Sequence, residues 1–206
     1  MQQKSSAVRE RNRRGEGDRL RAEILAATAR LLEAAGSDEG LSLRGVAREV
    51  GISPQSMYLH FANLDELVLA VLADSHGLMG RDLDAAADAE ADPVERVIAR
   101  GRAYLAWGAA HPGLYQVMYE GRLQSKPELE PGVLPPGRTL LYKVRDDVRA
   151  AMAAGAIPDG DAESLAYELW ALVHGLVSLR ANKPAMQWPD TGLLVDDAGR
   201  RILRAP

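Results

Sequence analysis

The side chains that most often perform covalent chemistry are scarce in this sequence and are not grouped as a reaction would require. There is no cysteine, which excludes disulfides and thiolate chemistry. The four histidines, His60, His76, His111 and His174, include no i, i+4 pair that could hold a metal ion. We find no paired carboxylates, no Ser-His-Asp pattern and no phosphate-binding loop, so we expect no enzyme, cofactor or metal site. An enzyme with a helical fold stays as an alternative class.

Positive charge is concentrated at the N-terminus, although the formal net charge of the chain is −4. Seven basic residues, Arg13 and Arg14 among them, stand within the first 21 positions against three acidic ones. A basic arm on an acidic body fits a protein that presents one end to a polyanion. A solvated, disordered tail explains the same residues equally well.

A second group of candidate binding residues is rich in aromatic and thioether side chains. It comprises the segment AYLAWGAAHPGLYQVMYE (residues 103–120) and Met79, and it carries few charges. Apolar walls with a few polar groups are typical of a small-molecule pocket, whereas such residues at helical spacing are more often plain core. The candidate ligand contacts in this group are Met79, Tyr104, Trp107, Tyr115, Met118 and Tyr119.

The elements that must position these residues are helices, because apolar residues recur at helical spacing throughout and no segment has the period of a strand. A first helix is expected to end at Gly36. Four prolines between residues 121 and 137 predict a loop there. Later helices are expected over residues 93–110, 112–120, 138–154, 161–181 and, more weakly, 191–204.

The sharpest local pattern lies between residues 42 and 61. Ser42 is a good N-cap for a short helix that Gly51 stops, and Ser53 with Pro54 begins another helix three residues later. Gly51 can adopt the positive φ that turns the chain. This spacing predicts a helix-turn-helix, whose second helix can place its first turn in a major groove.

The stretch LSLRGVAREVGISPQSMYLHFANLDELVLAVL (residues 41–72) closely resembles the DNA-binding domain of the TetR family. That pattern ends in Tyr-x-His-Phe, here Tyr58, His60 and Phe61, and continues into a long helix, here capped by Asn63. The resemblance implies an all-α fold, in which an N-terminal three-helix unit is joined by a long helix to a larger helical domain. We expect a flexible basic arm over residues 1–17, the helix-turn-helix domain over 18–65 and a ligand-binding and dimerisation domain over 66–206.

The resemblance also implies which side chains contact double-stranded operator DNA. Ser42 and Arg44 look like backbone contacts, and Tyr58 and His60 match positions that reach phosphates. Gln55 is the best candidate for reading a base edge, because its amide can pair with adenine. The full candidate set is Arg13, Arg14, Ser42, Arg44, Ser53, Gln55, Ser56, Tyr58 and His60.

Several of these positions have a structural alternative. Ser53 is in any case a helix cap, Ser56 is equally well a solvated side chain, and Tyr58 can be half-buried. Phe61 is assigned to the core. One departure from the family pattern is Leu64, which stands where the family usually has a phosphate-contacting lysine.

Near the C-terminus, LWALVHGLVSL (residues 169–179) resembles the Trp-x3-His-Gly signature of one class of regulatory domains in this family, through Trp170, His174 and Gly175. A helix apolar on most of its surface must be covered by its own domain and by a second subunit, so we expect a homodimer. His174 is either a hydrogen-bonded core residue or a ligand contact. Trp170 is likewise either packing or ligand contact.

Together these features predict a cytoplasmic, ligand-responsive transcription regulator. We expect a repressor that releases a palindromic operator when a small molecule binds the C-terminal domain; a DNA-binding regulator without ligand response is the alternative. No apolar run is long enough to cross a membrane, and the polar N-terminus lacks a signal-peptide core. The operator, the effector and the direction of regulation do not follow from the sequence.

Overall fold

All regular structure is helical in residues 16–121 and 137–204, which are the residues that this computed structural model describes. The expected all-α fold is confirmed, and the helices predicted after residue 92 match the observed bounds to within one residue. The predicted loop falls on residues 122–136, which lie outside the described residues. The helices are α1 (Glu16–Ala35), α2 (Leu43–Val50), α3 (Pro54–Tyr58), α4 (Leu64–Asp88), α5 (Pro93–Ala110), α6 (Pro112–Glu120), α7 (Arg138–Ala153), α8 (Ala162–Asn182) and α9 (Thr191–Arg204).

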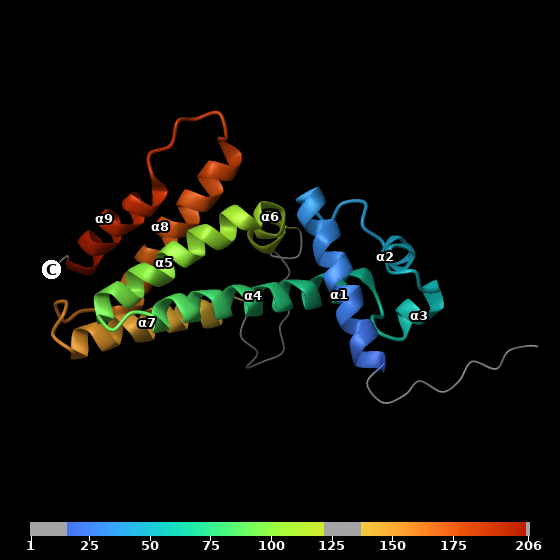
Figure 1. Cartoon of the computed structure of the whole chain (residues 1–206), viewed down its shortest axis with the longest axis horizontal. Helices are drawn as coiled ribbons and strands as arrows, with labels where there is room; N and C mark the ends of the chain where they lie inside the picture. The colour runs from blue at the N-terminus through green and yellow to red at the C-terminus, as the bar shows by residue number, and fades with distance from the viewer. Residues whose placement is uncertain (1–15, 122–136, 205–206) are drawn as a thin grey trace, which may run out of the picture.

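Helices α1, α2 and α3 lie together at one end of the molecule and form what we call the head, residues 16–63 (Figure 1). Their apolar faces meet around Ile24, Met57 and Phe61, each of which is almost completely buried. The Arg21 guanidinium lies 5.0 Å from the centre of the Phe61 ring, a cation–π contact on this small core. Phe61 is therefore core, as predicted.

The long helix α4 runs from the head into the rest of the molecule, which we call the body, residues 64–121 and 137–204 (Figure 1). Its N-cap is Asn63, whose side chain accepts a hydrogen bond from the backbone N–H of Glu66 at 2.8 Å. The Glu66 carboxylate reaches back to the N–H of Ala62 at 2.7 Å. The predicted cap is confirmed. In a standard capping box the Glu66 carboxylate would accept from the N–H of the N-cap residue Asn63, whereas here it accepts from the N–H of the preceding residue, Ala62.

The body packs α4 and α7 against α5, and α5 in turn against α8 and α9. One hydrophobic core runs without a break from the head through α4, α5, α6 and α8. A second, smaller core lies at the far end of the body, around Ile98, Val148 and Leu203. The larger core crosses from head to body, and close-packed interiors transmit strain. A displacement of core side chains in one part therefore strains the packing of the other.

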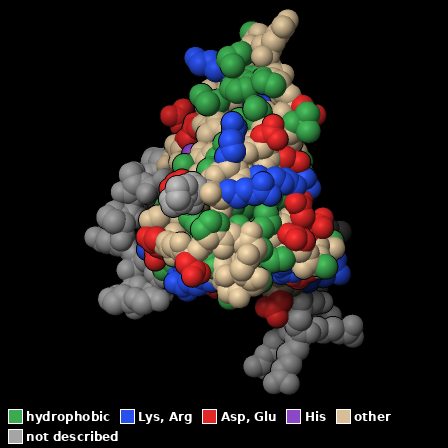
Figure 2. All heavy atoms as spheres, turned by 90° about the vertical axis from the view of Figure 1, so that its left-hand side faces the viewer, with side chains coloured by type: hydrophobic (Ala, Val, Ile, Leu, Met, Phe, Trp, Pro, Cys, Tyr) green, Lys and Arg blue, Asp and Glu red, His purple; other side chains and the backbone are tan. Residues whose placement is uncertain are grey.

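Half of the exposed large apolar side chains of the described residues lie on α8, on α9 and on the connection between them, and the others lie at α3 and on α4. Tyr167, Leu179, Met186 and Leu193 are between 39% and 64% exposed. In Figure 2, which views the body end-on, hydrophobic side chains cluster toward the top, where α8 gives way to α9. No helix among the described residues has the length and hydropathy that a membrane span needs.

Candidate nucleic-acid interface and ligand cavity

The helix-turn-helix is fixed by hydrogen bonds local to its two short helices. The Ser42 hydroxyl accepts from the N–H of Gly45 at 3.1 Å and caps α2. Gly51 ends α2 with a φ of 75°, a left-handed conformation that favours glycine. The Ser53 hydroxyl then accepts from the N–H of Ser56 at 3.1 Å and caps α3. The predicted corner and both predicted caps are confirmed.

One side of the helix-turn-helix is turned to solvent and is lined by the predicted contact residues. On α3, Gln55 is exposed and Tyr58 is 55% exposed. An exposed helix of this length, led by polar side chains, has the form of an element that enters a major groove. The predicted contacts that solvent reaches are Ser42, Arg44, Ser53, Gln55, Tyr58 and, in part, His60. Arg13 and Arg14 lie outside the described residues.

Ser56 faces the interior of the head, which corrects its assignment as a residue available to DNA. Its side chain is buried, like that of the neighbouring Met57. Its hydroxyl lies 2.9 Å from the Ser53 hydroxyl. α3 is only five residues long, and Ser56 and Met57 together occupy its inward side. The Ser56 hydroxyl is hydrogen-bonded to the hydroxyl of Ser53, the N-cap of the same helix.

Leu59 is a surface residue of the helix-turn-helix that the sequence analysis did not single out. It follows α3 directly, beside Tyr58, and is 82% exposed. An apolar side chain so fully in water gains nothing in the free protein, whereas it can pack on a thymine methyl group in a major groove. Its position between Tyr58 and His60, two predicted DNA contacts, is the sequence feature that could have indicated its exposure. The spacing of apolar residues gives little information in so short a helix.

A cavity of about 420 Å³ lies in the body. Its walls come mainly from α5, α7 and α8, completed by Leu83 of α4, Tyr119 of α6 and Val195 of α9. Most of the lining is aliphatic or aromatic, and the volume is within the range of roughly 300–1,000 Å³ that is typical of small-molecule sites. The cavity therefore has the size and character of a ligand site.

Half of the predicted ligand contacts line this cavity. Four residues face it: Tyr104, Tyr119, Trp170 and His174. The other four, Met79, Trp107, Tyr115 and Met118, are buried in the main core and do not line it, so their assignment as ligand contacts stays a prediction that this cavity does not support. Burial alone does not separate the two groups, because Tyr104 belongs to the same core as Trp107.

A chain of hydrogen bonds joins two of the cavity residues through a third that lies behind them. The Tyr104 and Tyr115 hydroxyls are 3.0 Å apart, and the Tyr115 hydroxyl lies 2.6 Å from Nδ1 of His174. Burial raises the pKa of Tyr104 and of Tyr115 and lowers the pKa of His174, because it disfavours the charged form of each. The chain is therefore uncharged near neutral pH. His174 is both of the things predicted as alternatives, a hydrogen-bonded residue and a lining residue.

The segment around His174 also bears on its neighbour Gly175. Among the described residues, nothing lies within 4 Å of the place that a Gly175 side chain would take. Gly175 thus serves no close helix approach within this chain. The resemblance to the Trp-x3-His-Gly class stays a prediction.

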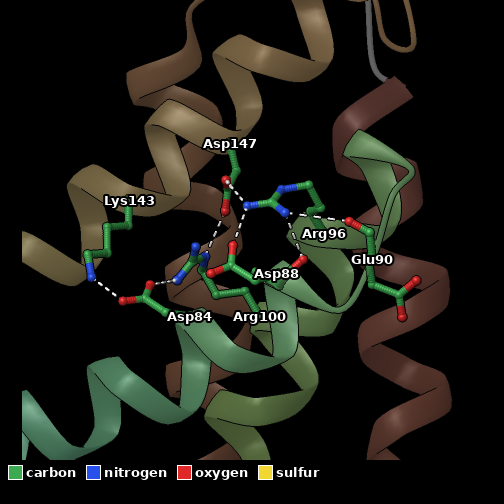
Figure 3. Close-up of polar contacts among 8 residues, drawn as sticks. Asp84, Asp88, Glu90, Arg96, Arg100, Lys143 and Asp147 are labelled. Atoms are coloured by element: carbon green, nitrogen blue, oxygen red, sulfur yellow. Dashed lines mark hydrogen bonds and ion pairs between the residues drawn. The ribbon is translucent and has the colours of Figure 1, made fainter.

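A cluster of ion pairs lies where α4, α5 and α7 meet, and one of its residues also lines the cavity (Figure 3). At its centre is Arg100 of α5, a cavity residue only 4% exposed. Its Nη1 donates to Asp84 of α4 at 2.7 Å and its Nε to Asp147 of α7 at 2.8 Å. Lys143 also donates to Asp84. Burial acts to raise the pKa of Asp84, but hydrogen bonds from Lys143 and Arg100 outweigh it and hold that pKa below its usual value.

Head and body meet where the end of α1 touches the start of α6. Both carboxylate oxygens of Glu33 accept hydrogen bonds from α6, from the N–H of Gly113 and the N–H of Leu114, each at 3.0 Å. A side chain at Gly113 would come within 2.0 Å of the Glu33 carbonyl oxygen, so only glycine permits this approach. A carboxylate on free N–H groups at a helix N-terminus is a favourable contact. We call this contact between Glu33 and the start of α6 the joint. No local sequence pattern indicates it, because Glu33 and Gly113 are 80 residues apart.

Two family models match the sequence. Residues 24–71 match the model described as "Bacterial regulatory proteins, tetR family". Residues 97–202, more than half of the chain, match the model described as "Tetracyclin repressor-like, C-terminal domain". An HTH-type transcriptional regulator of Haemophilus influenzae is 46% identical over 66 residues. That match spans about a third of each chain, 32% in both cases.

Solved structures with the same fold cover nearly the whole chain. A protein of unknown function from Rhodococcus sp. RHA1 superposes with a TM-score of 0.78 over 97% of each chain, at 28% sequence identity. The structure of AibR in complex with isovaleryl coenzyme A and operator DNA superposes with a TM-score of 0.64, covering 91% of this chain and 99% of that one, at 20% identity. At such identity the second likeness concerns the fold alone.

Proposed function

Because the chain belongs to the TetR family of bacterial regulatory proteins, we propose that this transcription regulator is a cytoplasmic homodimeric repressor, which binds a palindromic operator and releases it when a small molecule fills the body cavity. Family membership points to a transcription factor and not to an enzyme. The finer statements, repression, ligand response and the contact residues, are supported by the features of the molecule set out below.

One helix carries most of the support for a ligand response. The nine-residue α6 contributes Tyr119 to the cavity wall, and its N-terminus is held by Glu33 of the head. A ligand that displaces Tyr119 therefore acts on a short, stiff element whose other end is bonded to the head. The long α4 gives a second connection, since Leu83 lines the cavity and the N-terminus of α4 follows the helix-turn-helix.

The DNA contacts that we propose are the exposed candidates together with Leu59. Gln55 is assigned to a base edge, Tyr58 and Arg44 to phosphates, and Leu59 to a thymine methyl. Arg13 and Arg14 stay in the proposed set as phosphate contacts. The whole set is Arg13, Arg14, Ser42, Arg44, Ser53, Gln55, Tyr58, Leu59 and His60.

The proposed homodimer places a second copy against the exposed apolar side chains of α8 and α9. Tyr167, Leu179 and Leu193 stand too far out of the core to be covered by their own chain. A two-fold dimer presents two recognition helices to half-sites that are roughly 34–36 Å apart on the DNA. In this setting ligand binding needs only to favour a spacing of the two helices that no longer matches this distance. AibR, which shares the fold, has been seen with both an acyl-coenzyme A and operator DNA.

The test begins with selection of DNA from a random pool by the purified full chain, followed by fluorescence anisotropy on the enriched sequence. We expect a palindrome, with an affinity that falls steeply with salt because phosphate contacts release counterions. The double variant Gln55→Ala/Tyr58→Ala should lose the selected sequence, while Asp159→Asn, an exposed change at the far end of the body, should keep it. Absence of any enriched sequence would contradict the DNA-binding part of the proposal.

A regulator with no ligand response is the second candidate, and only the cavity distinguishes the two. The cavity volume of about 420 Å³ and its mostly apolar lining favour ligand binding, because small-molecule sites are typically of this size and character. Thermal unfolding across a small-molecule library separates the two candidates, since a true ligand stabilises the folded dimer by mass action.

A further inference from the structure

The buried charge of the cavity lining is already paired, and this restricts what the inner part of the cavity can hold. Arg100 is the buried cation of the lining, and two of its nitrogens are bonded to Asp84 and Asp147. The surrounding cluster holds three cations and three carboxylates: Arg96, Arg100 and Lys143 with Asp84, Asp88 and Asp147. Such a balanced set offers little net attraction to an anion entering from the cavity side.

The other charged residue of the described lining is exposed to solvent, and it contacts a neutral tyrosine. Arg138 is exposed, its Nε donates to the Tyr142 hydroxyl at 3.3 Å, and its guanidinium carbon lies 5.7 Å from the centre of the Tyr142 ring. No carboxylate is among the described residues that line the cavity, so a cationic ligand has no counter-ion there. Burying an unpaired charge in such a site would be strongly unfavourable.

The polar part of the lining is the hydrogen-bond chain from Tyr104 through Tyr115 to His174, which we call the relay. Its two ends, Tyr104 and His174, line the cavity, and its middle does not. If Nδ1 of His174 accepts from Tyr115, then Tyr104 must donate to Tyr115. In that case the cavity meets a donor at Nε2 of His174. The Tyr104 hydroxyl also has hydrogen bonds with Tyr119 and Trp170, so His174 is the end of the relay that can serve a ligand.

The opposite tautomer reverses the role of His174 toward the cavity. If Nδ1–H donates to Tyr115, then Nε2 of His174 becomes an acceptor. The relay therefore presents a donor in one state and an acceptor in the other. A hydroxyl group, which is donor and acceptor at once, suits either state, whereas an ether or carbonyl oxygen only accepts.

We propose that the ligand of this cavity is an uncharged, mainly apolar molecule that carries a hydroxyl group, and that this hydroxyl binds to the relay. The inference rests on the proposed function, because it specifies the ligand which that function requires. The apolar remainder of the molecule packs on the aliphatic walls, among them Ile98, Val144 and Leu172.

The experiment uses four probes that share one apolar tail and differ in the polar group: 4-pentylphenol, 4-pentylcyclohexanol, 4-pentylanisole and 4-pentylbenzoate. Binding to the full chain is measured by isothermal titration calorimetry. We expect the two hydroxyl compounds to bind about tenfold more tightly than the methyl ether, as one buried hydrogen bond provides. We expect the carboxylate to bind at least about 100-fold more weakly than the phenol.

The variants assign the preference to the relay. His174→Phe removes the imidazole that meets the ligand's hydroxyl and keeps an aromatic ring in the cavity wall, so it should bring the hydroxyl-to-ether ratio close to one. His174→Ala repeats the test if His174→Phe folds poorly. Tyr142→Phe is the matched control, because Tyr142 lies outside both the relay and the cavity lining and the loss of its hydroxyl should leave the ratio unchanged.

Each outcome separates this inference from the proposed function. Tight binding of the carboxylate, an unchanged ratio in both relay variants, or no binding of any probe at millimolar concentration would overturn the inference. Release of the selected operator is followed separately by anisotropy. If the hydroxyl probes bind through the relay but DNA stays bound, the inference about ligand chemistry stands and the proposed regulatory role fails. If the carboxylate binds tightly and releases DNA, the regulatory role stands and the inference about ligand chemistry fails.

Discussion

The head and the body place their polar side chains in opposite directions. In the head, Gln55 and Tyr58 point into water from a helix that Ser53 caps. In the body, Arg100, Tyr104 and His174 point into a cavity and are bonded to partners far away in the sequence. The head therefore suits the DNA contact that we propose, and the body suits the proposed small-molecule ligand. This difference predicts that substitutions in the head alter binding with little effect on stability, whereas substitutions in the body alter both.

The largest loss of stability is expected at the centre of the ion cluster. Arg100→Leu leaves two carboxylates without their buried partner and should lower the free energy of unfolding by about 3 kcal/mol. The control is Arg102→Leu, two residues further along α5. Arg102 makes a two-point ion pair with Asp196 near the surface, at 2.7 and 2.6 Å, and such pairs contribute less than about 1 kcal/mol. Equal losses for the two variants in urea unfolding would mean that burial does not distinguish these pairs.

The joint between head and body should be the next most sensitive point. Gly113→Ala forces a methyl group against the Glu33 carbonyl oxygen and should cost about 2 kcal/mol of unfolding free energy. The matched control is Gly77→Ala in α4, where the nearest atom is the mobile end of Arg81, 3.8 Å away. That change should stabilise the helix by up to about 1 kcal/mol. A Gly113→Ala protein as stable as the wild type would show that this approach is not tight.

In the head, the prediction is a change of binding without a change of stability. Gln55→Ala should weaken binding to the selected operator by about tenfold or more and relax the base preference at one position of each half-site. Its free energy of unfolding should stay within about 0.5 kcal/mol of the wild type, because Gln55 is exposed. Equal weakening on every DNA sequence would assign Gln55 to a phosphate and not to a base.

The smallest expected effect is a pH dependence that arises in the body. Burial lowers the pKa of His76 from its ordinary value of 6.5, although a hydrogen bond to the Leu72 carbonyl partly opposes this. A histidine whose folded-state pKa is depressed contributes its full stability above the unfolded value, and this stability declines as pH falls below about 6.5. The contribution of His76 to the decline should be less than about 1 kcal/mol at pH 6. His76→Gln should flatten the unfolding free energy between pH 6 and 7, and an unchanged profile would contradict this assignment.

The sequence predicts the head well, because the features of the head are local. Ser42, Gly51, Ser53 and Asn63 each act on residues no more than three or four positions away, so their spacing reveals the caps and the corner. Ser56 was the exception. Which side of so short a helix faces inward depends on how α3 packs on α2, and spacing alone does not fix that.

The body is predicted less completely, because its site is assembled from distant segments. Aromatic composition pointed to the right region, yet Trp107 and Met118 proved to be core while Tyr119 lines the cavity. Arg100 gave no signal in the sequence, since its partners Asp84 and Asp147 are 16 and 47 residues away. Only the packing of α4, α5 and α7 brings these three together.

The central claim, that paired copies of α3 read two half-sites on one face of the DNA, is tested most directly by changing the spacing of the selected operator. Inserting about five base pairs between the half-sites turns one of them by half a helical turn. We predict that affinity then falls to that of a single half-site, and that insertion of a full turn restores part of it. An affinity that does not respond to the insertion would contradict the claim, because it would mean that the two recognition helices do not bind as a rigid pair.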